Sequence, residues 1–146
     1  MGADPFHAAV AVILILTLIA AIAFKAHACE DCTLAMLPLA GCWLALEWRL
    51  HPDFRETILL LTELVTFGLL VRLALRFDRR FPLLMAAFAL IAVMSGVLAM
   101  SGLGLEDWQH RLIANWAWSG ATLALIGGLA RHVPHYRSAP NGKRLR

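Results

Sequence analysis

Charged residues are scarce in this chain. Asp, Glu, Lys and Arg make up 16% of its 146 residues, whereas they make up about a quarter of an average soluble domain. Hydrophobic residues reach 60%, and the mean hydropathy is +0.70. They stand in long blocks separated by short charged segments, without the residue-by-residue alternation of a transmembrane barrel. The composition therefore excludes an ordinary soluble domain and indicates a helical membrane protein.

Catalytic signatures are also missing. The sequence contains no glycine-rich phosphate loop, no HExxH and no GxSxG. Its six histidines fall at the ends of apolar segments or between them, where they are poorly placed to hold a haem between helices. The net charge of +3 comes from positive residues beside the apolar segments, where such charges set membrane orientation. We therefore expect no enzyme activity, no cofactor and no nucleic-acid partner.

Five apolar segments predict an all-α fold, a polytopic integral membrane bundle. The segments are residues 8–24, 33–48, 57–75, 82–103 and 112–130. A full crossing takes roughly 20 apolar residues, and about 17 is the lower limit. The second segment is short and contains Pro38, so the alternative to five transmembrane helices is four plus one re-entrant or interfacial segment. Residues 1–130 then form a single domain, and residues 131–146 are predicted to be a flexible basic tail.

The distribution of Lys and Arg predicts the orientation. If all five segments cross, ten of the thirteen lie on one side and three on the other. Positive residues favour the cytoplasmic side, so we expect a cytoplasmic C-terminus in a bacterial inner membrane. With four crossings the split becomes nine to four. A cleaved signal peptide ending near Ala28 is disfavoured, because no Lys or Arg precedes the first apolar segment.

One carboxylate interrupts the third apolar segment. Glu63 stands in LLLTELVTFGLL, and an ionised carboxylate facing lipid costs a few kcal/mol. Polar residues on the fourth and fifth segments fall at a similar depth. We predict an intramembrane polar cluster of Glu63, Thr66, Ser95, Asn115 and Ser119. Such a cluster is either interhelical glue or a site for a proton, a cation or a small substrate.

A CxxC pattern precedes the second segment. Cys29 and Cys32, with His27, offer ligands for a soft metal or a redox pair. The alternative is two ordinary cysteines at the membrane interface.

Arginines gather after the third segment, and tryptophans gather toward the predicted outer side. The arginines Arg72, Arg76, Arg79 and Arg80 suit anionic lipid headgroups or serve only as an orientation signal. The tryptophans Trp43, Trp48, Trp108, Trp116 and Trp118 are typical of an aromatic belt, and the last two are also candidates for a lid over the polar cluster.

These observations favour a non-enzymatic membrane protein that serves as an accessory, assembly or structural subunit of a membrane complex. Its expected partners are membrane lipids and other membrane subunits or copies of itself. Two alternatives remain. One is an oligomeric small transporter or channel with Glu63 as its ion- or proton-coupled residue. The other is a metal- or redox-handling protein that uses Cys29 and Cys32.

Overall fold

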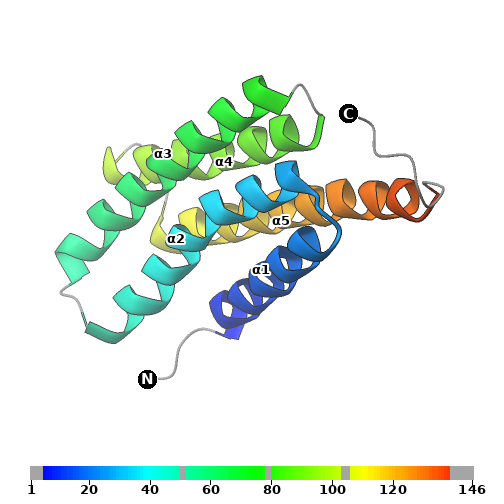
Figure 1. Cartoon of the computed structure of the whole chain (residues 1–146). Coiled ribbons are helices and arrows are strands. Elements are labelled where there is room, and N and C mark those ends of the chain that lie inside the picture. Colours follow the sequence, from blue (N-terminus) through cyan, green and yellow to red (C-terminus); the bar gives the residue numbers. More distant parts are fainter. Residues whose placement is uncertain (1–4, 50–51, 78–79, 103–105, 139–146) are drawn as a thin grey trace.

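The computed structural model describes residues 5–49, 52–77, 80–102 and 106–138, and these residues form α-helices without any strand. The helices are α1 (Pro5–Ala23), α2 (His27–Arg49), α3 (Pro52–Phe77), α4 (Arg80–Met100) and α5 (Asp107–Ser138). The expected all-α fold is therefore confirmed. Figure 1 shows the helices lying side by side in one bundle, with α5 reaching beyond the others at its C-terminal end.

Among the described residues, three helices are long and apolar enough to cross a membrane. The stretches are Glu56–Phe77 of α3, Arg80–Met100 of α4 and Trp108–Arg131 of α5. Residues Ala8–Ala23 of α1 are apolar but form a shorter stretch. The helical part of the chain is thus suited to a membrane, and length and composition support three of the five expected crossings.

The helices begin before the predicted segments, and the extensions of α2 and α5 bear on the predicted sites. Helix α2 begins at His27, so the CxxC pattern lies in its first turns and not in a loop. Helix α5 continues to Ser138, so the predicted tail is helical at its start. This differs from the expectation because backbone hydrogen bonding continues past the last apolar residue. Residues 139–146 of that tail lie outside the described part of the chain.

Helix α5 contacts three other helices of the bundle. It packs along α4 and also contacts α1 and α2, while α2 lies between α1 and α3. At roughly 1.5 Å per residue, a helix as long as α5 exceeds the hydrocarbon thickness of a bilayer. Because α5 touches three other helices, a polar side chain on its inner face is placed to reach several elements.

Small residues lie on the buried face of α4, and large apolar residues are exposed on the outside of the bundle. The buried face of α4 includes Ala86, Ala89 and Ala92. By contrast, Leu75 of α3 is 82% exposed and Leu123 of α5 is 68% exposed. Small residues let helix backbones approach closely, and large apolar side chains are at home against lipid tails. This distribution is the one expected of a bundle surrounded by lipid.

Two phenylalanines of α4 lie on two glycines of α5. A Cβ atom on Gly120 would come within 2.6 Å of the Phe88 ring, and one on Gly128 within 2.7 Å of the Phe81 ring. No real Cβ atom tolerates such a contact, so the two rings occupy the space that the glycines leave open. These contacts fix the register of α4 against α5.

The start of α5 is set by a cap. The main-chain N–H of Glu106 donates to the Gln109 side-chain carbonyl at 3.1 Å, and the main-chain N–H groups of Gln109 and His110 bond to the Glu106 carbonyl. This is one half of a capping box, which satisfies donors left over at a helix start. The helix therefore begins before its apolar segment, and His110 lies within its first turn.

Candidate functional site

Glu63 of α3 is joined to Trp118 of α5. The indole Nε1 of Trp118 donates a hydrogen bond to Glu63 Oε1 at 3.1 Å. The carboxylate is only 4% exposed and the indole 1% exposed. A charge-assisted bond in such surroundings is stronger than one in water. Glu63 therefore faces the bundle interior and links two helices that are far apart in the sequence.

A second tryptophan packs against this pair. Trp43 of α2 meets Trp118 edge to face, with ring centroids 6.0 Å apart and an interplanar angle of 80°. Edge-to-face pairs are worth about 0.5–1.5 kcal/mol beyond their buried area. The contact brings α2 to the same level as Glu63, and the Thr62 hydroxyl lies 3.5 Å from the Cys42 sulfur between α3 and α2. Three helices thus enclose one side of the carboxylate.

A hydroxyl of α4 and an imidazole of α5 form the other side. Ser95 Oγ donates its hydrogen to the Ala92 carbonyl at 2.8 Å and lies 3.1 Å from His110 Nδ1. A serine hydroxyl has only one hydrogen. One hydrogen cannot serve both contacts, so the donor between Ser95 and His110 depends on the tautomer of His110.

Gly96 of α4 lies beside both the Glu63–Trp118 pair and the Ser95–His110 pair. A Cβ atom on Gly96 would lie 3.8 Å from Glu63 Oε2, 3.4 Å from His110 Cε1 and 2.9 Å from Leu60 Cδ1. Glu63 of α3 and His110 of α5 therefore approach the same residue of α4, and Leu60 fills the space beside it.

Comparisons with family models, with curated proteins and with solved structures give no significant match. Any functional reading of this cluster therefore depends on the chain's own residues.

The predicted polar cluster is placed as follows. Glu63, Thr66 and Ser95 are all buried, with Thr66 one turn beyond Glu63 on α3. Asn115 and Ser119 are half-buried, and the Ser119 hydroxyl donates to the Asn115 carbonyl at 2.7 Å. The single hydrogen of that hydroxyl therefore stays within α5 and is not given to Glu63.

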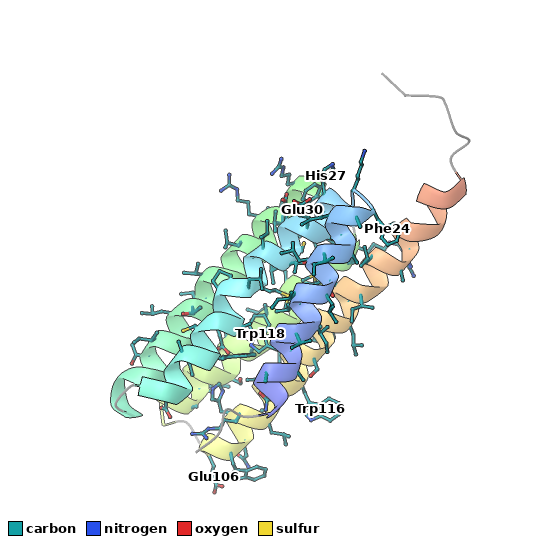
Figure 2. The ribbon with its side chains drawn as sticks, turned by 60° about the horizontal axis from the view of Figure 1, so that its bottom comes forward. Phe24, His27, Glu30, Glu106, Trp116 and Trp118 are labelled. Carbon is teal, nitrogen blue, oxygen red and sulfur yellow. The ribbon has the colours of Figure 1, made fainter. Side chains whose placement is uncertain are left out.

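Sequence reasoning missed Trp118 and His110 as partners of this cluster. Trp118 was expected in an aromatic belt or a lid, yet it points into the bundle, while Trp116 points away and is 71% exposed (Figure 2). The sequence places His110 at the end of an apolar segment or in a loop, whereas it lies in the first turn of α5. The two stand eight residues apart with Ala114 midway, which is the spacing of one helix face. That spacing was a usable signal, provided the helix was known to begin before residue 110.

The CxxC cysteines are buried away from His27. Cys29 is 2% exposed and Cys32 is fully buried, whereas the His27 side chain is 79% exposed and lies 3.5 Å from Glu30. Within the described ranges, no group of three His, Cys, Asp or Glu side chains is close enough to hold a metal ion. Burial, followed by the nearby Cys29 and Asp31, raises the pKa of the Cys32 thiol to about 12. A protonated thiol is a poor ligand and nucleophile.

Three of the arginines expected at lipid headgroups lie where α3 ends and α4 begins, namely Arg72, Arg76 and Arg80. Arg72 and Arg80 are exposed, and Arg79 lies outside the described residues. Arg76 lies 3.8 Å from Asp31, which joins α3 to α2, and its guanidinium is also 5.4 Å from the centre of the Phe77 ring. An exposed pair of this kind contributes less than about 1 kcal/mol.

Proposed function

We propose that this chain is a small, non-enzymatic, multipass protein of the bacterial inner membrane that acts as an accessory, assembly or structural subunit of a membrane complex. The observation that carries the proposal is the buried bond between Trp118 and Glu63. A solute site needs an accessible carboxylate, whereas this one is enclosed and already linked to a neighbouring helix. A carboxylate used in this way serves the architecture of the bundle.

The outer surface supports the same proposal. Exposed side chains on four helices are large and apolar: Ile19, Leu75, Leu83 and Leu123. Such a surface accommodates either lipid or another membrane subunit. Our proposed topology has five crossings and a cytoplasmic C-terminus. In it α1 and α2, which are not among the three long apolar helices, cross the membrane packed against neighbouring helices.

Site-directed photocrosslinking tests the subunit proposal. A photoreactive residue is placed at each of the four exposed positions, one at a time, in cells. A subunit gives crosslinks to one protein, confined to one or two helices and present in nearly fixed ratio to the chain. Crosslinks to lipid alone at all four positions would contradict the proposal.

A small transporter or channel is the second candidate, favoured by the position of Glu63 and His110 beside the same residue, Gly96. Flux in proteoliposomes separates the two. Wild-type protein and Glu63→Gln are reconstituted at equal density and compared for proton and cation leak. A subunit gives equal, background flux in both. A wild-type flux that disappears in a folded Glu63→Gln variant favours the transporter.

A further inference from the structure

Arg72 is a charged residue on the outside of an apolar helix. It lies within Glu56–Phe77, the stretch of α3 that is suited to a membrane, and its side chain is exposed. At about 1.5 Å per residue it stands roughly 7–8 Å before Phe77, the last residue of α3. The exposed Leu69 and Leu75 flank it along the helix. A guanidinium among lipid tails is costly, so an arginine near a helix end extends its charge toward the headgroups.

Arg72 differs in its partners from the arginine one turn further along α3. The guanidinium of Arg76 lies 3.8 Å from the Asp31 carboxylate and 5.4 Å from the centre of the Phe77 ring. Within the described part of the chain, no hydrogen bond or ion pair joins Arg72 to another side chain. The charge of Arg76 is therefore balanced from α2, whereas the charge of Arg72 needs an anion from the surroundings. Lipid phosphate is the anion at the edge of a bilayer, and a guanidinium binds it through charge-assisted hydrogen bonds.

Positive charge accumulates at this end of the bundle. Helix α1 ends here, α2 begins, α3 ends and α4 begins, and Phe81 of α4 packs on Gly128 of α5. Among the described residues, the positive side chains in these parts of the helices are Lys25, Arg72, Arg76, Arg80 and Arg131, and the negative ones are Glu30 and Asp31. The surplus complements anionic headgroups. Because Arg72 stands among exposed apolar side chains, the ligand that fits it combines an anionic group with an apolar chain.

Open space lies on the same face of α3, one turn before Arg72. Gly68 is exposed, and no atom lies within 4 Å of the position that its Cβ atom would occupy. Residues four apart share one face of a helix. The helix interior disfavours glycine, and no contact among the described residues requires a glycine at this position. The face continues through Leu64 and Leu61, both exposed, so a charge, an opening and an apolar surface follow one another along α3.

We propose that this face of α3, made of Leu61, Leu64, Gly68 and Arg72 and named the α3 lipid face, binds one anionic phospholipid. The Arg72 guanidinium donates to the phosphodiester oxygens. One acyl chain lies in the open space at Gly68 and continues along Leu64. A phospholipid fits this order of groups because its charge and its apolar chains are joined end to end.

The α3 lipid face is independent of the role as a subunit. That role concerns other proteins, whereas this face recognises a lipid by its phosphate. Crosslinks to one protein would leave lipid binding at Arg72 possible, and a face without lipid preference would leave the subunit proposal standing.

Native mass spectrometry of the full chain in detergent micelles tests the proposal, because it resolves protein with one lipid bound. The protein is titrated with phosphatidylglycerol, which is anionic, and with phosphatidylcholine, which is zwitterionic. Wild type should bind the first phosphatidylglycerol more tightly than the first phosphatidylcholine. In Arg72→Gln we expect binding of the first phosphatidylglycerol to weaken about fivefold, the contribution of one basic side chain at an anionic lipid surface, with phosphatidylcholine binding unchanged. The matched control is Arg111→Gln, which removes an exposed charge from the first turns of α5 and should leave both affinities unchanged.

A pair of glycine variants tests the same face without changing any charge. Gly68→Leu fills the open space and should weaken the binding of the first phosphatidylglycerol. Gly127→Leu on α5 is the control, since Gly127 is also exposed with no atom within 4 Å of its Cβ position. If Arg72→Gln does not fold, this pair decides the question. Equal phosphatidylglycerol affinities in the two folded glycine variants would overturn the proposal.

Three further results would also overturn the proposal. One is an unchanged phosphatidylglycerol affinity in folded Arg72→Gln, and another is displacement of the lipid by inorganic phosphate, which would assign Arg72 to a free anion. The third is a membrane protein that co-purifies with wild type and is lost in Arg72→Gln while lipid binding is unchanged. That result would assign the counter-charge of Arg72 to a carboxylate of a partner subunit.

Discussion

Trp118 of α5 and Glu63 of α3 are 55 residues apart in the sequence, yet the indole N–H of one donates to the carboxylate of the other at 3.1 Å. The pair lies where α2, α3, α4 and α5 come together, and Trp43 closes it on the α2 side. It explains why an apolar segment accepts an acidic residue. The carboxylate obtains a hydrogen-bond donor in place of water, and the large indole obtains a partner for its only polar atom.

Removal of the indole donor should destabilise the bundle. In Trp118→Phe, Glu63 Oε1 loses its donor in a buried place, and we expect a cost of about 1–3 kcal/mol in the free energy of unfolding. Glu63→Gln keeps an acceptor oxygen at the same position and should stay within about 1 kcal/mol of wild type. Equilibrium unfolding in mixed micelles, followed by circular dichroism, measures both. The control is Trp116→Phe, because Trp116 is 71% exposed and points away from the bundle. Equal costs at the two tryptophans would contradict the structural role of the link.

The sequence was sufficient to predict helices but not which face of each helix is buried. Hydropathy identified the segments because each is an apolar run between charged segments. On α5, however, a polar stripe through Asn115 and Ser119 competed with a face through Ala117 and Ala121. The second face is buried because it carries Trp118, whose indole gains most from burial against α2 and α3. Local periodicity contains no information about those distant partners.

His110 was missed for a different reason. Apolar periodicity begins near residue 112, whereas the helix begins where the Glu106 and Gln109 groups satisfy its first donors. Helix boundaries are set by such caps, and hydropathy does not report them. A residue that hydropathy assigned to a loop was therefore already part of the helix and could reach Ser95.

Two adjacent glycines of α5 should respond oppositely to substitution. In Gly128→Ala the new Cβ atom meets the Phe81 ring at 2.7 Å, and overpacking of this kind costs about 1–3 kcal/mol. In Gly127→Ala nothing lies within 4 Å of the Cβ position, and the gain in helix propensity is about 1 kcal/mol at most. Unfolding free energies of the two variants provide the comparison. Similar values would mean that Phe81 does not lie on Gly128.

The turn between α1 and α2 contains avoidable strain. Lys25 has a φ of 53°, and its N–H bonds to the Ile22 carbonyl while that of Ala26 bonds to the Ala21 carbonyl. This is the Schellman arrangement, in which glycine is the usual residue. A left-handed conformation costs other L-residues roughly 1–2 kcal/mol, so Lys25→Gly should raise the unfolding free energy by about 1 kcal/mol. Lys25→Ala keeps the strain and serves as the control. A Gly variant no more stable than the Ala variant would contradict this conformation.

The CxxC thiols should be unreactive in the folded protein. Burial raises the pKa of Cys32 to about 12 from an ordinary value of 9.0, so the folded state keeps this proton at a pH at which the unfolded chain begins to lose it. The raised pKa of Cys32 stabilises the folded protein at a pH below 9.0, and this contribution declines as the pH rises from 9.0 toward 12.

Maleimide labelling of a Cys42→Ser variant should therefore stay slow as the pH is raised to 9, and it should become fast only in denaturant. Replacement of Cys32 by Ala should make the unfolding free energy less sensitive to pH above 9.0, provided the fold is kept. Rapid labelling of both thiols at neutral pH would instead support the metal- or redox-handling alternative, because it would show that the first turns of α2 open to solvent.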